Sequence, residues 1–280
     1  MQRTYRFRDG KKLILGGRTL VMGILNVTPD SFSDGGKWNT RDRALRHMEE
    51  MVHDGADIID IGAESSRPGF VPMGAAEETE RLMPFLESVL AECSVPVSVD
   101  TFKAETARAA LSAGAHLLND IWGLQYAEEP EEMARAAAEA NVPVVVMHNQ
   151  NGTVYDGDII AAMRTFFSRS LAIADAAGLA RENIILDPGI GFGKTAEQNL
   201  QVIKRMDELV SYEGADYPVL LGASRKSFIG AALDLPVEER MEATGAACVL
   251  GIARGACIMR VHDVKPIVRM CRMADAILGA

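Results

Sequence analysis

Short apolar runs alternate with longer amphipathic stretches along the chain. The runs are rich in Val, Ile and Leu, and most of the stretches between them repeat apolar residues every three or four positions, as a half-buried helix does. The eight runs are TLVMGILN (19–26), DIIDIGAES (57–65), PVSVDT (96–101), HLLNDI (116–121), VPVVVMHN (142–149), NIILDPG (183–189), PVLLGAS (218–224) and ACIMRVHD (256–263). Helices are expected most clearly over 40–55, 131–142 and 158–178. This alternation predicts an α/β architecture with a parallel sheet.

The number of strand–helix units favours a closed barrel. A (β/α)8 TIM barrel typically takes about 250 residues, and the chain has 280. A doubly wound open sheet is the alternative, which the lack of a GxGxxG motif after the first run weakens. The segment YRFRDGKKLILGG predicts a β-hairpin over about residues 4–18 that closes the N-terminal face of the barrel. No linker divides the chain, so one domain over 1–280 is predicted, with the barrel over about 19–275.

The apolar runs end in polar side chains. These are Asn26, Glu64, Asp100, Asn119, His148, Asp187, Ser224 and Arg260. Barrel enzymes place their catalytic groups at the C-terminal ends of the strands. A strand can end in a polar residue simply because it leaves the core, but that explains eight successive cases poorly. The pattern therefore indicates an active site on this face.

Composition and charge exclude several classes of partner. A net charge of −10 argues against general nucleic-acid binding. No run of about 18 apolar residues is present, and the N-terminus MQRTYRFRDGKK lacks the apolar stretch of a secretory signal. The four cysteines show no CxxC spacing, which favours reduced thiols. A cytoplasmic protein with no membrane or nucleic-acid partner is expected.

Seven motifs, in this order, resemble the signature set of dihydropteroate synthases, a family of pterin-binding TIM-barrel enzymes. They are GILNVTPDSFSDGG (23–36), ESSRPG (64–69), VSVDT (97–101), LNDIWG (118–123), DPGIGFGK (187–194), GASRKSFIG (222–230) and RVHDV (260–264). The set spans nearly the whole chain and is far more specific than any one motif. The resemblance implies a magnesium-dependent transferase of folate synthesis. It would join 6-hydroxymethyl-7,8-dihydropterin diphosphate to 4-aminobenzoate, giving 7,8-dihydropteroate and diphosphate.

The first motif is rich in Gly, Ser and Asp and is expected to form an exposed loop, and the second motif, ESSRPG, is implied by the resemblance to form another. The resemblance makes them lids over the site and makes Asn26 a magnesium ligand, for which an amide oxygen is suitable. Asp34 would stabilise positive charge on the pterin. Ser66 stands where the family usually has Thr and keeps the hydroxyl beside the aminobenzoate. Arg67 offers a planar fork for a carboxylate or phosphate, although a surface salt bridge is the other interpretation.

The central motifs are implied to bind the pterin through Asp100, Asn119 and Asp187. The amino-pyrimidinone edge of a pterin presents adjacent N–H donors, which a carboxylate accepts side by side and an Asn amide complements. Carboxylates that merely cap barrel strands are the alternative. Met147 is implied to pack near the pterin ring and Phe192 against the aminobenzoate ring, whereas the resemblance assigns no role to His148.

The last motifs supply cationic groups. Lys226 is implied to contact the pterin as a catalytic group, and Ser227 to lie near the aminobenzoate carboxylate. Arg260 and His262 are two positions apart on a strand, so they share a face and would form a diphosphate site. DPGIGFGK is not a P-loop, because Pro188 stands where GxxxxGK requires Gly.

Other functions remain open at this point. A pterin-dependent methyltransferase shares the barrel and the pterin pocket, but it would require a corrinoid partner. A non-catalytic paralogue would bind a pterin or a partner protein. The resemblance also implies a homodimer formed through helices late in the barrel.

Overall fold

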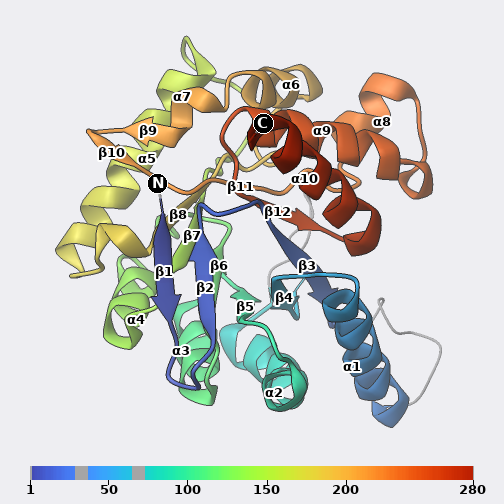
Figure 1. Ribbon diagram of the computed structural model, residues 1–280. Helices are drawn as coiled ribbons and strands as arrows, with labels where there is room; N and C mark the ends of the chain where they lie inside the picture. The colour runs from blue at the N-terminus through green and yellow to red at the C-terminus, as the bar shows by residue number, and fades with distance from the viewer. Residues whose placement is uncertain (1, 29–36, 65–72, 280) are drawn as a thin grey trace.

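Parallel strands form the centre of the molecule (Figure 1). The computed structural model describes residues 2–28, 37–64 and 73–279. Within these residues, one eight-stranded sheet has the order β11-β12-β3-β4-β5-β6-β7-β8. The strands are β3 (Leu20–Asn26), β4 (Ile58–Gly62), β5 (Val97–Asp100), β6 (Leu117–Asp120), β7 (Val144–Met147), β8 (Ile184–Asp187), β11 (Leu220–Leu221) and β12 (Ile258–Val261). A bridge between Leu186 and Val219 joins the two edges of the sheet, so the predicted barrel is confirmed and the open sheet is excluded.

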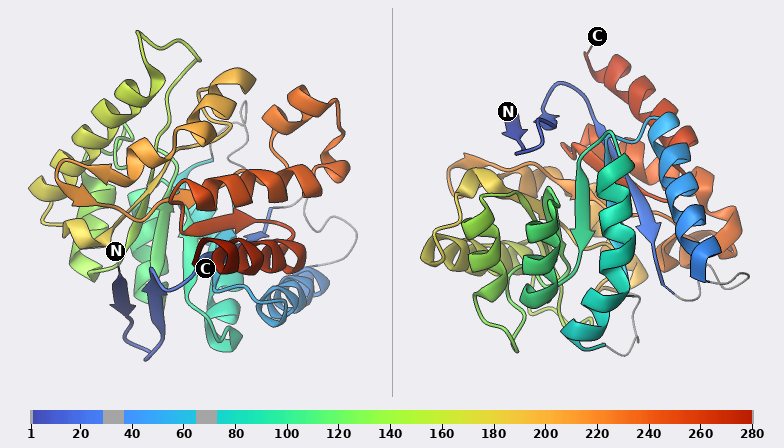
Figure 2. Two further views of the ribbon diagram at one scale, coloured as in Figure 1. Left: turned by 45° about the horizontal axis from the view of Figure 1, so that its top comes forward. Right: turned by 90° about the horizontal axis from the view of Figure 1, so that it is seen from below.

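Helices surround the barrel (Figure 2). They are α1 (Lys37–His53), α2 (Ala75–Glu92), α3 (Ala104–Ala113), α4 (Glu132–Ala140), α5 (Ile159–Ala176), α6 (Ala196–Lys204), α7 (Asp207–Val210), α8 (Ser227–Leu233), α9 (Met241–Ala253) and α10 (Val264–Gly279). Single 3-10 turns cover Arg181–Asn183 and Val237–Glu239, and a small antiparallel pair joins β9 (Ser211–Tyr212) to β10 (Ala215–Asp216). The three clearest predicted helices correspond to α1, α4 and α5.

The strands are shorter than the apolar runs that predicted them. The run 218–224 contributes only Leu220 and Leu221 as β11, and the run 142–149 contributes only Val144–Met147. The residue directly after each barrel strand other than β12 is also buried, but it leaves the ladder and begins a loop above the barrel. An apolar run therefore predicted the location of each strand better than its end.

The barrel interior is built in two layers of opposite character. The lower layer is apolar and fully buried, and it consists of Met22, Ile58, Leu117, Val145, Ile185, Leu220 and Ile258. Because side chains two apart on a strand share a face, the next inward positions form a layer nearer the C-terminal ends. That layer is mostly polar and includes Asp60, Asp100, Asn119, Asp187 and Arg260. The period of two therefore places an apolar floor beneath a polar site.

A hairpin of β1 (Arg3–Arg6) and β2 (Lys12–Leu15) closes the lower end of the barrel. Gly10, in the predicted Asp-Gly turn, has φ +89°, a conformation that favours glycine. Tyr5, Leu13 and Leu15 pack against the apolar floor. Asp9 lies 3.0 Å from His116 Nε2 and attaches the turn to the residue before β6. The predicted hairpin is confirmed, and it leaves the C-terminal face of the barrel as the open end.

Candidate active site

Arg260 lies at the centre of a buried ionic network at the C-terminal end of the barrel. Its Nε donates to Asp60 Oδ2 and its Nη2 donates to Asp100 Oδ2, both at 2.6 Å. Asn119 Nδ2 donates to the same Asp60 oxygen at 3.0 Å. The network joins side chains from β4, β5, β6 and β12. It therefore brings together three of the predicted site residues, Asp100, Asn119 and Arg260.

Asp60 is a site residue that the strand-end pattern missed. It lies in the middle of β4, is fully buried and bonds to both Arg260 and Asn119. The sequence did carry a signal, since Asp60 interrupts a run of isoleucines two positions after Ile58, whose side chain belongs to the apolar floor. Among the described residues its Oδ1 is buried and has no hydrogen-bond partner, and an unsatisfied buried polar atom of this kind calls for an explanation.

Burial raises the pKa of Asp100 to about 7, against the opposing effect of the Arg260 guanidinium. Two carboxylates share this cation, and the charge of Asp60 also raises the pKa of Asp100. The site can therefore hold a proton on a carboxyl group near neutral pH. Such a group can present either a donor or an acceptor to a heterocycle.

Asp187 and Lys226 form a second charged group beside the network. The Asp187 carboxylate is buried and accepts a hydrogen bond from the Gly189 amide at 2.7 Å. Burial raises its pKa, while the charge of Lys226 opposes that shift. Burial also lowers the pKa of Lys226 to about 8. A Cβ added at Gly222 would lie 3.7 Å from Lys226 Nζ and 3.8 Å from Asp187 Oδ2, so this glycine leaves open the space that the two groups face.

An apolar wall stands beside the charged groups. Its buried members are Phe102, Ile121 and Met147, with Trp122, Tyr126 and Phe192 packed against them. Lys226 Nζ lies 4.7 Å from the centre of the Phe192 ring and also donates to the Ile190 carbonyl. The structure therefore brings the predicted residues Met147 and Phe192 into one surface suited to flat rings.

His262 and Ser227 lie at the edge of the site near β11 and β12. The His262 amide and its Nδ1 contact Ser224 Oγ at 3.2 and 3.0 Å, so the imidazole bonds to the loop after β11. Ser227 is exposed and begins α8 directly after Lys226. Arg225, in the same loop, pairs with Asp263. The joint anion site of Arg260 and His262 stays a prediction.

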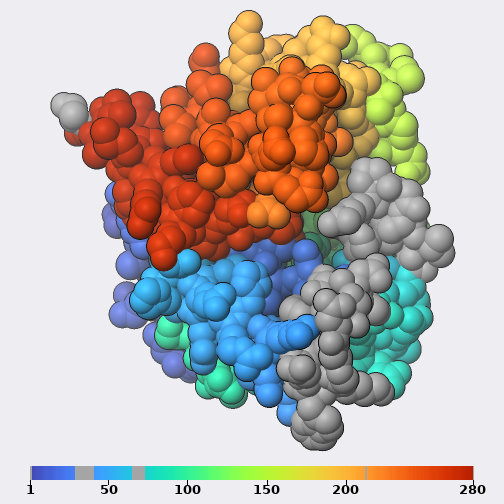
Figure 3. Space-filling model, turned by 90° about the vertical axis from the view of Figure 1, so that its right-hand side faces the viewer, coloured from blue at the N-terminus to red at the C-terminus, as the bar shows by residue number. Residues whose placement is uncertain are grey.

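Asn26 ends β3 at the rim of the barrel and is half-buried. Asp34, Ser66 and Arg67 lie outside the described residues, so their predicted roles stay predictions. Figure 3 views this face, where the surface is hollowed between the blue α1 and the orange α8. Within the described ranges no group of three His, Cys, Asp or Glu side chains is arranged to hold a metal ion.

A buried ionic group borders the second predicted loop. Lys103 Nζ donates to Glu64 Oε2 at 2.6 Å and to Glu78 Oε2 at 3.0 Å. Glu64 Oε1 also accepts from the Met73 amide at 2.7 Å. Glu64 thus bonds to the residue that follows segment 65–72, which carries Ser66 and Arg67. The strand-end pattern included Glu64, but it did not show this pairing with Lys103.

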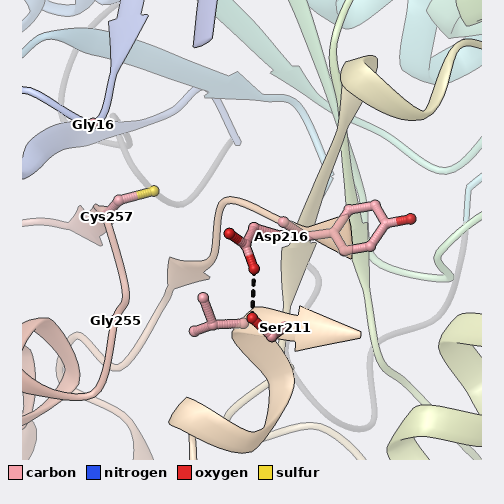
Figure 4. A pocket seen from close by; sticks show the side chains of 7 residues that line it. Gly16, Ser211, Asp216, Gly255 and Cys257 are labelled. Carbon is pink, nitrogen blue, oxygen red and sulfur yellow. Dashed lines mark hydrogen bonds between the residues drawn. The ribbon is translucent and has the colours of Figure 1, made fainter. Parts of the chain in front are cut away.

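A hollow at the opposite end of the barrel is a poor candidate for the active site (Figure 4). It is lined by Gly16, Val210, Ser211, Asp216, Tyr217, Gly255 and Cys257. Ser211 and Asp216 hydrogen-bond to one another there, and none of the predicted site residues lines it. In barrel enzymes conservation and contacts at the N-terminal end serve stability, whereas chemistry lies at the other end.

The fold and the site together define a TIM-barrel enzyme whose open end carries buried charged groups beside an apolar, aromatic wall. Residues 22–262 match the family described as pterin binding enzyme. The chain is 54% identical over 262 residues to dihydropteroate synthase of Bacillus subtilis, covering 94% of this chain and 90% of that protein. None of the helices in the described part of the chain is long and apolar enough to cross a bilayer.

Solved structures agree with the sequence match. The Xanthomonas albilineans dihydropteroate synthase with 4-aminobenzoic acid is 38% identical, with a TM-score of 0.90 and coverage of 99% of this chain and 100% of that one. The Burkholderia cenocepacia enzyme complexed with 7,8-dihydropteroate is 36% identical, with a TM-score of 0.88 and coverage of 100% and 98%. The chain belongs to the dihydropteroate synthases, which are transferases of folate biosynthesis.

Proposed function

We propose that the network around Arg260, with Asp187 and Lys226, binds the pterin diphosphate, and that 4-aminobenzoate binds against Phe192. The observation that carries the proposal is the layer of interacting polar and charged side chains, Asp60, Asp100, Asn119 and Arg260, directly above an apolar floor. So many buried polar groups are costly to a fold, which argues for a ligand that uses them. The names of the related structures, with 4-aminobenzoic acid and 7,8-dihydropteroate, support these two ligands.

In the reaction the aniline nitrogen of 4-aminobenzoate forms a bond to the pterin methylene carbon as the bond from that carbon to the diphosphate oxygen breaks. The nitrogen then loses a proton. An aniline nitrogen is a poor nucleophile, so we infer that departure of diphosphate leads. Arg260 and His262 would offset charge growing on the leaving group. Asp100, Asn119 and Asp187 would hold the pterin edge, and Lys226 would bond to the ring system.

Asn26 is the described residue that fits a role in magnesium binding. Its amide oxygen lies at the strand end, and magnesium usually keeps several waters and substrate phosphates besides one or two protein ligands. The donor set therefore fits an ion that arrives with the diphosphate. When bound, magnesium would neutralise diphosphate charge. We propose it as the cofactor, with Asn26 as its ligand.

Segments 29–36 and 65–72 would complete the site. Asp34 would stabilise positive charge on the pterin, and Arg67 would bind an anionic group of either substrate. Ser66 and Ser227 would line the aminobenzoate pocket. If these segments cover the pterin before the reaction, the two substrates bind in order, with the pterin diphosphate first.

We propose that two copies of the chain pair through α9 and α10. These neighbouring helices present apolar side chains that are each more than half exposed, namely Leu250, Met273, Ile277 and Leu278. Exposed apolar patches mark interaction surfaces in soluble proteins. Sedimentation should show a dimer that Leu250→Glu with Met273→Glu converts to a monomer, whereas Ile14→Glu on the hairpin should leave it intact. A monomeric parent protein would refute the pairing.

The four cysteines are free, which supports a reducing compartment, and we propose the cytoplasm.

The decisive experiment couples labelled 4-aminobenzoate to the pterin diphosphate with the purified protein, with and without magnesium. We expect labelled dihydropteroate that disappears when EDTA removes the metal. Pterin binding without product would favour a non-catalytic paralogue. Methylcobalamin formation from a methylated folate would favour a corrinoid methyltransferase instead.

A further inference from the structure

Lys194 and His148 form a buried polar pair that the reaction described above does not use. Their exposed fractions are 8% and 2%. Lys194 Nζ lies 2.9 Å from His148 Nδ1 and donates to the carbonyl oxygens of Gly189 and Phe192, both at 3.0 Å. His148 follows β7 and Lys194 ends the DPGIGFGK loop after β8. The pair therefore links two neighbouring loops at the open end of the barrel.

The protonation of the pair follows from its surroundings. Burial, with the charge of Lys194, lowers the pKa of His148 to about 2, so the imidazole is neutral and its Nδ1 accepts. The ring is enclosed by Tyr155, Phe166 and Phe167, at centroid distances of 6.0, 4.9 and 6.3 Å. A lysine ammonium has three N–H donors, and here it meets three acceptors. Losing its proton would leave one of these acceptors without a partner.

The loop fastened by Lys194 has little regular structure of its own. Gly189, Gly191 and Gly193 have φ values of +65°, +85° and +54°. A Cβ added at Gly189 would lie 1.9 Å from the His148 carbonyl oxygen, so the loop lies directly on the backbone after β7. Tyr155 Oη adds a bond to the Gly193 carbonyl at 2.7 Å. Side-chain bonds, rather than a strand or helix, thus determine where this loop lies.

The same loop supplies two contacts to Lys226. The Ile190 carbonyl accepts from Lys226 Nζ, and the Phe192 ring lies 4.7 Å from that nitrogen. The carbonyls that Lys194 holds belong to Gly189, one residue before Ile190, and to Phe192, two residues after it. A shift of this loop would therefore move both the ring surface and a partner of the pterin-binding lysine.

We propose that Lys194 and His148 are positioning residues, which hold Phe192 and the Ile190 carbonyl where 4-aminobenzoate and Lys226 require them. Neither residue needs to touch a substrate. This inference rests on the proposed function, because it assigns the Phe192 face to 4-aminobenzoate.

The charges near Lys194 make the proposal testable by pH. Burial lowers the pKa of Lys194 to about 7; the charge of Asp187 opposes this shift and that of Lys226 adds to it. His148 and Tyr155 stay neutral near that pH because burial lowers the pKa of the first and raises that of the second to about 12. Asp187 and Lys226 also contact the loop, and burial raises the pKa of Asp187 and lowers that of Lys226 to about 8, so a loss of activity that Lys194→Arg shares with the parent belongs to these groups and not to Lys194. As the pH rises above 7, Lys194 loses a donor and the loop loses a bond.

The first experiment compares the parent enzyme with Lys194→Met in the coupling assay. The KM for 4-aminobenzoate should rise about tenfold or more, which is the effect of losing one or two buried hydrogen bonds. This rise should be larger than any rise in the KM for the pterin diphosphate. Lys204→Met, at an exposed lysine of α6, should change neither constant. His148→Gln, which keeps one acceptor, should raise the same KM by a smaller factor and provides the test if Lys194→Met does not fold.

The second experiment measures kcat/KM for 4-aminobenzoate against pH. The parent should lose activity above about pH 7, and Lys194→Arg, which stays charged, should retain it to higher pH. Loss of kcat in proportion to folded protein, with both KM values and the pH profile unchanged, would show a merely structural role and overturn the proposal. A parent protein that makes no dihydropteroate would refute the proposed function instead, so the two failures are distinguishable.

Discussion

Replacing Lys103 by Met removes the cation that lies between two buried carboxylates. The side chain of Lys103 is 5% exposed, and those of Glu64 and Glu78 are 6% and 1% exposed. Methionine has a similar length and leaves the packing largely intact, so the variant isolates the charge. Its removal leaves Glu64 and Glu78 without the partner that both contact within 3.0 Å.

Two estimates of the cost agree. A hydrogen bond to a charged group contributes about 1.5–3 kcal/mol, so two such bonds correspond to roughly 3–6 kcal/mol. Removing one partner of a buried ion pair costs about 3–5 kcal/mol, because the remaining charge stays buried. Since domains unfold with a free energy of about 5–15 kcal/mol, Lys103→Met should remove roughly a fifth or more of the stability.

The penalty should depend on pH in a definite direction. Burial raises the pKa of Glu78, and Lys103 opposes that shift, so the variant raises this pKa further. Between the unfolded and folded pKa values the native state holds a proton that the unfolded chain has released. The free energy of unfolding therefore falls as the pH rises through this window. The loss caused by Lys103→Met should be smaller at pH 5 than at pH 8.

Urea unfolding followed by circular dichroism at both pH values measures the effect. Lys204→Met, on the exposed side of α6, serves as the control and should stay within about 0.5 kcal/mol of the parent. A loss below about 1 kcal/mol at pH 8, or a larger loss at pH 5 than at pH 8, would refute the assignment of a buried, charged Lys103.

Three further results are expected. Asp187→Asn should weaken pterin binding by about 1.5–3 kcal/mol, as for loss of a charged hydrogen-bond partner; unchanged affinity in calorimetry would remove Asp187 from the pterin site. Arg260→Ala should lose magnesium diphosphate binding and also lower the free energy of unfolding by about 3–5 kcal/mol, because Asp60 and Asp100 lose their cation; a variant that binds diphosphate like the parent would exclude Arg260 from the anion site. Gly189→Ala should be far more destabilising than Gly178→Ala in thermal unfolding, since both have positive φ but an added Cβ clashes with backbone only at 189; equal effects would contradict the close approach of the two loops.

The apolar periodicity determined the architecture, because each strand of a barrel is buried on both sides and therefore consists largely of apolar residues. It also determined the face of the site, since Asp100 and Asp187 end their strands. The substrates came from the order of the motifs, a resemblance that the comparisons bear out as family membership. Periodicity alone carries no information about a pterin.

Tertiary structure decided which polar groups face one another. Arg260 is 200 residues from Asp60 in the chain and 160 from Asp100, and only closure of the barrel brings the three together. Asp60 was missed because it lies inside its strand and not at the end, and the sequence does not show that Arg260 and Asn119 are its partners. Lys194, His148 and Lys103 likewise acquire their roles from contacts between loops. A sequence specifies locally which side chains are buried, whereas the pairing that makes a buried charge tolerable is a property of the folded chain.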